Sequence, residues 1–204
     1  AVKRADEVLA EAPDRIPASL LKGRALQSLQ RVEDARLVYE EAMQKAPTDP
    51  GPVLLLATLE RERGDAKRAE ELFRKLTEVQ PGFASFVALA GFLAADRTRD
   101  AETEPLYRSA LEKAEAKEKV AAFVTLANFL YSRERYADAE ATLERGIDEV
   151  HDAEDTDQQH DPPAVLLAVL HGAHDVRGAV HQDRRREEHR EHKQGDSGAH
   201  ERED

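Results

Sequence analysis

The sequence predicts an all-α protein built from stacked antiparallel helical hairpins, which is an α-solenoid. Prolines recur every 34 residues, at Pro13, Pro47 and Pro81. At the same spacing an alanine is followed four residues later by an aromatic side chain, as in "ARLVY" (residues 35–39) and "AEELF" (residues 69–73). A fixed period of this length is typical of helical repeats, since one hairpin cannot bury its apolar face but a stack of hairpins can.

The array is expected to begin in the middle of a hairpin. Counting back 34 residues from Ala35 gives Ala1, so residues 1–12 are predicted to be a second helix without its partner. The sequence is therefore interpreted as a fragment of a longer array. The predicted domain contains a half-repeat and four units, over residues 1–15, 16–49, 50–83, 84–119 and 120–150.

The unit over residues 50–83 shows the helical pattern most clearly. In residues 66–79, "AKRAEELFRKLTEV", the apolar side chains are spaced three and four apart. That period predicts a helix with one buried face. Residues 53–64 form the other predicted helix, Gly64-Asp65 is the expected turn, and Pro81-Gly82 closes the unit.

This pattern resembles the tetratricopeptide repeat family over residues 1–150. The resemblance depends on a small residue in each first helix, an alanine in the second helix and a large residue four positions later. These are Gly23, Ala57, Gly91 and Ala127; Ala35, Ala69 and Ala139; and Tyr39, Phe73, Tyr107 and Leu143. The unit over residues 84–119 departs from the pattern, with Thr103 for the alanine and Glu115 for the closing proline. Two inserted residues are assigned to its polar stretch, residues 114–119.

The resemblance implies a right-handed superhelix whose concave groove is lined by the first helix of each unit. By position, the groove residues are Leu20, Arg24, Gln27, Leu54, Thr58, Arg61, Ala88, Phe92, Ala95, Val124, Asn128 and Tyr131. Leu54, Phe92 and Val124 could equally pack between helices, so groove and core remain alternatives for them. Arg24, Arg61 and Asn128 fit a groove better, and they suggest a partner with apolar anchors and acidic or backbone acceptors.

One subtype of the family is not expected. Members that bind chaperone tails hold a terminal carboxylate with Lys and Asn side chains on successive first helices. The matching positions here include Leu20, Leu54, Thr58 and Ala88, so that clamp is missing.

Composition argues against several functions. The formal net charge is -12, so nucleic-acid binding is not expected. The longest apolar run, residues 164–170, is too short to span a bilayer. There is no cysteine, no glycine-rich phosphate loop, and no histidine before His151. The sequence therefore predicts no enzyme, no cofactor, no metal site and no membrane insertion.

The repeat pattern ends after Val150. Residues 151–180 are expected to form an acidic loop and a degenerate helix, and residues 181–204 a charged, His-rich, disordered tail. The pairs His171-x-x-His174 and His189-x-x-His192 permit a metal site, but too few ligands support one. Two interpretations of this segment stay open. It is either a natural disordered tail or the product of a shifted reading frame.

Together these observations predict a protein-protein interaction scaffold of bacterial type that binds a peptide or helix in its groove. The alternative is a structural spacer in an envelope or secretion assembly. The sequence leaves the partner, the compartment and the oligomeric state open.

Overall fold

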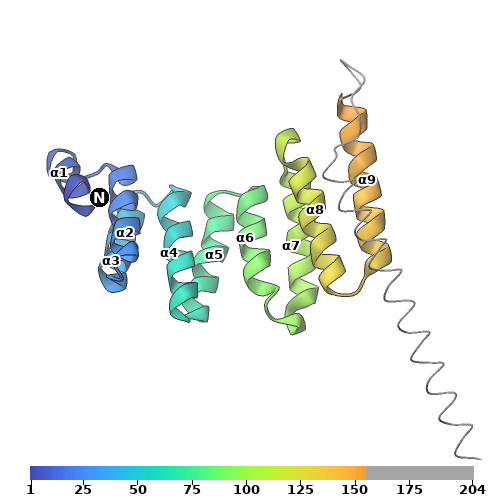
Figure 1. Cartoon of the computed structure of the whole chain (residues 1–204), viewed down its shortest axis with the longest axis horizontal. Helices are drawn as coiled ribbons and strands as arrows, with labels where there is room; N and C mark the ends of the chain where they lie inside the picture. The colour runs from blue at the N-terminus through green and yellow to red at the C-terminus, as the bar shows by residue number, and fades with distance from the viewer. Residues whose placement is uncertain (155–204) are drawn as a thin grey trace, which may run out of the picture. The chain divides into compact units, whose positions relative to one another are not determined.

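The computed structural model describes residues 1–154, and this part is all-helical, as predicted (Figure 1). The helices are α1 (Val2–Glu11), α2 (Ile16–Ser28), α3 (Val32–Lys45), α4 (Pro50–Arg63), α5 (Ala66–Val79), α6 (Phe83–Leu93), the 3₁₀ helix η1 (Arg97–Arg99), α7 (Asp100–Lys113), α8 (Ala116–Ser132) and α9 (Tyr136–Glu154). The chain divides into two compact units after Ala114.

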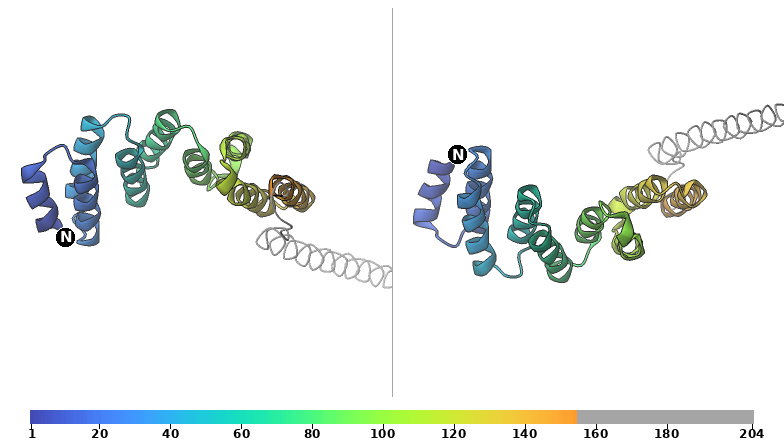
Figure 2. Two further views of the ribbon diagram at one scale, coloured as in Figure 1. Left: turned by 90° about the horizontal axis from the view of Figure 1, so that it is seen from above. Right: turned by 90° about the horizontal axis from the view of Figure 1, so that it is seen from below.

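The first unit, residues 1–114, is a stack of hairpins. Helices α2 and α3, α4 and α5, and α6 and α7 pair within hairpins, and α1 packs on α2. Each hairpin also packs on the next through its neighbouring helices, and α2 touches α4. Figure 2 shows these helices following one another in chain order. The predicted array of helical hairpins is therefore confirmed.

The α4–α5 hairpin shows how local residues set the helix ends. Asp49 Oδ1 accepts a hydrogen bond of 2.8 Å from the Gly51 amide at the start of α4. Asp65 Oδ1 accepts one of 3.0 Å from the Arg68 amide at the start of α5. Between the helices Gly64 has φ of 84°, which is the left-handed conformation that glycine adopts without a Cβ clash. The turn predicted at Gly64-Asp65 is therefore confirmed.

The repeated alanine and aromatic positions form the core of the first unit. Ala35, Tyr39, Ala69 and Phe73 are all buried in one cluster. A small residue opposite Tyr39 is required, because a Cβ on Gly23 would lie 2.2 Å from the Tyr39 ring. The residues that identified the repeats are therefore core residues of the first unit.

The α6–α7 hairpin is built differently from the others. Helix α6 ends at Leu93, and the chain continues through η1 before α7 begins. Asp96 Oδ1 caps η1 by accepting hydrogen bonds from the amide and the hydroxyl of Thr98, at 2.9 and 2.7 Å. Thr103, which replaces the repeat alanine, is buried, and its hydroxyl donates to the Arg99 carbonyl at 2.9 Å. Its polar group is therefore satisfied inside the helix.

The second unit contains the α8–α9 hairpin. Phe123 of α8 is buried, and a Cβ on Gly146 of α9 would lie 2.7 Å from it, so the two helices approach closely there. The Glu115 amide donates to Glu118 Oε2 at 3.0 Å, and this capping contact starts α8 at Ala116. The polar stretch expected to absorb an insertion is therefore mostly helical, and it lengthens α8.

Helix α9 continues past the expected end of the array at Val150, to Glu154. The first four residues of the segment predicted as an acidic loop, residues 151–154, are thus helical. The degenerate helix, the His-rich tail over residues 181–204, its metal pairs and the shifted-frame hypothesis all lie outside the described residues.

Candidate functional site

The predicted groove positions of the first unit lie on α2, α4 and α6. Arg24, Leu54 and Arg61 have exposed side chains, and Leu54 is 40% exposed. The others on these helices, Leu20, Gln27, Thr58, Ala88 and Phe92, are half-buried, and Ala95 is exposed in the turn that follows α6. Only some of the predicted groove residues are therefore exposed to solvent.

The guanidinium groups of Arg24 and Arg61 form no ion pair with any residue that the structure describes. Most other arginines of the first unit do form such pairs. These are Arg31, Arg36, Arg63, Arg68, Arg74, Arg99 and Arg108. The two arginines on the predicted face are therefore available to an external acceptor.

Gln27 has a partner inside the protein. Its Oε1 accepts a hydrogen bond of 2.6 Å from the hydroxyl of Tyr39. The Tyr39 side chain is fully buried, and this burial raises its pKa to about 12. The bond to Gln27 satisfies the one polar group of that ring, so Gln27 supports the core as well as lining α2.

Phe92 and Leu20 also contact the core. The rings of Phe92 and Phe73 have centroids 5.3 Å apart in a tilted arrangement. The Leu20 Cδ1 atom lies 3.0 Å from where a Cβ of Gly51 would be, so Leu20 packs against α4. Phe92 therefore packs on the core ring of Phe73 while its side chain stays half-buried.

The other groove positions lie on α8, in the second unit. Asn128 is exposed, whereas Val124 and Tyr131 are half-buried. The Tyr131 ring packs edge-on against Tyr136 at the start of α9, with centroids 5.0 Å apart. Burial raises the pKa of Tyr131.

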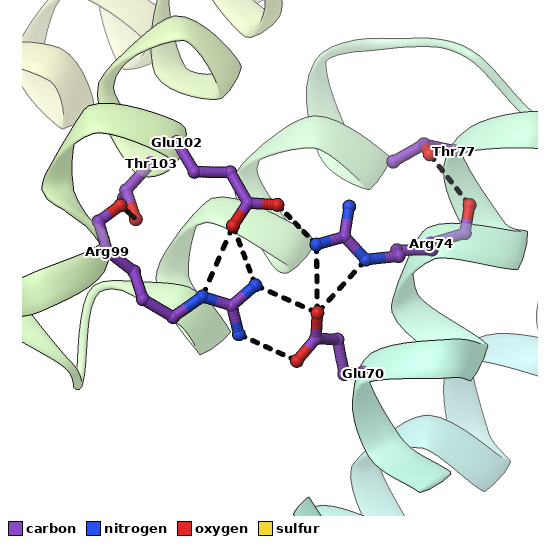
Figure 3. A network of polar contacts seen from close by, with 6 residues as sticks. All are labelled: Glu70, Arg74, Thr77, Arg99, Glu102 and Thr103. Atoms are coloured by element: carbon purple, nitrogen blue, oxygen red, sulfur yellow. Dashed lines mark hydrogen bonds and ion pairs between the residues drawn. The ribbon is translucent and has the colours of Figure 1, made fainter. Parts of the chain in front are cut away.

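An ion-pair network that the sequence reasoning missed joins α5 to α7 (Figure 3). Arg99 donates to both carboxylate oxygens of Glu70, at 2.7 and 2.9 Å. Arg74 donates to Glu70 at 2.8 Å and also contacts Glu102, which accepts from Arg99 at 2.7 Å. The hydrogen bonds from Arg99 and then from Arg74 lower the pKa of Glu70 to about 2.

A cleft of about 460 Å³ lies beside this network. Its lining comes from the start of α5, the end of α6 and the η1 turn. The lining residues are Ala66, Lys67, Glu70, Phe92, Leu93, Ala95, Asp96 and Arg99. Lys67 is not one of the repeat positions, and the cleft lies where α6 ends and η1 begins.

Within residues 1–154, no group of three or more His, Cys, Asp or Glu is placed to hold a metal ion. In the same part of the chain, no helix has the length and apolar character needed to cross a membrane.

Comparison with known proteins agrees with the geometry. Residues 33–91 match the tetratricopeptide repeat family. No curated protein matches the sequence.

Several solved structures have a similar fold at low identity. A thermophilic tetratricopeptide repeat protein of Thermus thermophilus, TTC0263, is 17% identical, with a TM-score of 0.56 over 84% of this chain and 88% of that one. YrrB, described as having an unusual peptide-binding site, is 14% identical, with a TM-score of 0.55 over 72% and 75%. Yeast Tom70 is 18% identical, with a TM-score of 0.65 over 87% of this chain and 36% of its own.

This fold supports a role in protein-protein interaction in general. Residues 33–91 thus match the tetratricopeptide repeat family, and the likeness to these solved structures shows the same fold of stacked helical hairpins.

Proposed function

We propose that the chain is a non-enzymatic interaction scaffold, and that α2 and α4 hold a peptide or helix of a partner protein. The observation that supports this most is the pair of exposed arginines, Arg24 and Arg61, which lack ion pairs within the described part of the chain. An exposed arginine loses little when it stays solvated, but it can bind a carboxylate with two parallel hydrogen bonds.

The partner is expected to combine apolar and acidic side chains. Leu54 lies on α4 between the two arginines in sequence, and it is one of the more exposed large apolar residues. An apolar anchor of the partner would cover Leu54, while acidic groups or carbonyls on either side would meet Arg24 and Arg61. YrrB, which has a similar fold, is described as having a peptide-binding site, and this supports such a role.

The test is a double charge reversal, Arg24→Glu with Arg61→Glu. Peptides would first be selected on the unmodified protein from a random display library, and their affinities measured by fluorescence anisotropy. We expect selected peptides to be rich in Asp and Glu, and the reversal to weaken them at least about tenfold, since each lost pair becomes a repulsion.

The matched control is Lys3→Glu with Arg4→Glu on α1, which changes the net charge equally. These side chains are also exposed, but they lie outside the predicted groove. Circular dichroism should show the same helical content for all three proteins. Unaltered affinity in the α2–α4 variant would contradict the groove proposal.

The second candidate function is a structural spacer that contacts its neighbours through its edges. One observation favours the spacer function. Three leucines outside the predicted groove are more exposed than Leu54, and these are Leu21, Leu29 and Leu37. Replacing these three by serine would weaken assembly in that role and leave peptide affinity unchanged.

A further inference from the structure

We infer that the cleft at the end of α6 is a second recognition site, which takes an aromatic or large aliphatic side chain that stands next to an acidic one. The cleft is the one lined by Ala66, Lys67, Glu70, Phe92, Leu93, Ala95, Asp96 and Arg99. It shares Phe92 and Ala95 with the predicted groove, and otherwise it rests on different residues from those of the proposed α2–α4 site.

The cleft exists because α6 is short. Helix α4 continues to Arg63 and ends directly at the Gly64 turn, whereas α6 ends at Leu93 and the chain turns through η1. The side chains of an additional helical turn are therefore missing beside the start of α5. This leaves a hollow of about 460 Å³, which can hold one bulky side chain and the backbone on either side of it.

The floor of the cleft is apolar and held in place. Phe92 is supported from below by Phe73, at 5.3 Å between ring centroids, and Leu93 is buried beside it. Ala66 and Ala95 add small side chains that leave space open. An apolar side chain that enters would gain contact with Phe92 without displacing a packed residue.

The walls of the cleft are preorganised by polar contacts. The Arg99 guanidinium is bound by Glu70 and Glu102, so it keeps its position and offers little to a ligand. Asp96 is engaged by the amide and hydroxyl of Thr98. Because these groups are already held in place, little conformational entropy is lost from them when a ligand binds.

Lys67 gives the cleft its charge preference. Its ammonium group makes no ion pair with any residue of the described part, unlike Arg99 in the same lining. A carboxylate next to the bound apolar side chain would be attracted to Lys67, whereas a basic residue there would be repelled. The complementary ligand is therefore an acidic segment with an apolar anchor.

The experiment uses the full chain labelled with ¹⁵N and three capped tripeptides, Glu-Phe-Glu, Lys-Phe-Lys and Glu-Ser-Glu. Amide chemical shifts would be followed as each peptide is added. We expect Glu-Phe-Glu to shift the amides around Lys67, Ala95 and Arg99 in a saturable way. The peptide without the aromatic ring and the basic peptide should bind at least about fivefold more weakly.

Two variants separate the cleft from general charge effects. Ala95→Phe places a ring in the hollow from an exposed position, so it should abolish the shifts while leaving the spectrum of the remaining core intact. Lys67→Glu should reverse the preference between the acidic and basic peptides. Lys75→Glu, on the same helix but outside the cleft, is the matched control and should bind as the unmodified protein does.

Arg24→Glu with Arg61→Glu should leave this binding unchanged, so the two proposals can fail independently. The inference is overturned if Lys-Phe-Lys binds as well as Glu-Phe-Glu, if Ala95→Phe still binds, or if no saturable shift occurs in the cleft.

Discussion

Gln30 and Glu134 have left-handed backbone conformations, with φ of 60° and 62°. Gln30 lies one repeat before Gly64, which has φ of 84° at the same place in its hairpin. Glu134 has the same role between α8 and α9. A side chain with a Cβ is strained in this conformation, by roughly 1 kcal/mol or more, so these two turns are less favourable than the turn at Gly64.

Gln30→Gly should therefore stabilise the protein, by about 0.5–1 kcal/mol of unfolding free energy. Gly64→Ala should destabilise it by about 1 kcal/mol, because the alanine would be forced into the strained conformation. Urea unfolding followed by far-ultraviolet circular dichroism measures both changes. Gln44→Gly, at an exposed position within α3, is the control, and it should destabilise by about the same amount. A loss of stability in Gln30→Gly would contradict this account of the turn.

Phe73 makes the largest expected single contribution to the core, since its ring is buried and also supports Phe92. Phe73→Ala should lower the unfolding free energy by roughly 3–5 kcal/mol, because it leaves a cavity between packed helices. Phe83→Ala, at the half-buried first residue of α6, should cost clearly less. Chemical denaturation of both variants would test the difference, and equal losses would show that Phe73 is not central to the core.

Among the elements, the paired helices of each hairpin were predictable and the α6–α7 connection was not. The spacing of Ala35, Tyr39, Ala69 and Phe73 marks buried positions, and such positions repeat whenever the hairpin repeats. The residues around η1 contain no glycine and continue a polar pattern, so nothing in the sequence marks the early end of α6.

The candidate site, like the order of the helices, could be predicted from the sequence only in part. The position of a residue within the repeat indicates the face of the helix that carries its side chain. Arg24, Leu54 and Arg61, which were chosen in this way, are exposed in the structure. The position does not give the partner reached by a long side chain. Gln27 therefore proved to be a hydrogen-bond acceptor for Tyr39, and a signal existed, since a buried tyrosine hydroxyl needs an acceptor.

The network that links α5 to α7 makes the contact between these helices depend on pH. The pKa of Glu70 is lowered to about 2 from an ordinary value of 4.5, and the pKa of Glu102 is lowered as well. A carboxylate with a lowered pKa stabilises the folded state fully above its unfolded pKa. That stabilisation is lost as pH falls from about 4.5 toward 2.

Glu70→Gln should consequently lower the thermal midpoint at neutral pH, and the difference from the unmodified protein should shrink between pH 4.5 and pH 2. The control is Glu71→Gln, because the ion pair of Glu71 is an exposed one with Arg68, at 3.0 Å. Thermal melts at low ionic strength across this range provide the measurement. If the thermal midpoints of Glu70→Gln and the unmodified protein differ by the same amount at every pH, the charge of Glu70 does not contribute to folding stability.

For the whole molecule, the division after Ala114 predicts separable folding. Residues 1–114 contain their own buried cluster, from Leu26 to Leu93, and helices pack mainly on their neighbours in sequence. Stability in such arrays is approximately a sum of unit and nearest-neighbour terms.

A chain of residues 1–114 should therefore fold on its own, with helical circular dichroism and a cooperative urea transition. Ending the chain at Val79 instead would remove the partner surface of α5, and should reduce cooperativity and the transition midpoint. A non-cooperative transition for residues 1–114 would show that α8 and α9 are needed for the first unit to fold.

The neighbour-to-neighbour packing of the hairpins also has a consequence for the order of folding. The contacts of the first unit join mainly helices that are adjacent in sequence, and topologies of this kind fold quickly because little loop entropy is lost before contacts form. During synthesis, α2 and α3 can pair as soon as both have left the ribosome, and α4 and α5 can then dock on a surface that already exists. Each folded hairpin provides the surface on which the next one packs, so the array can fold hairpin by hairpin while the chain is being synthesised.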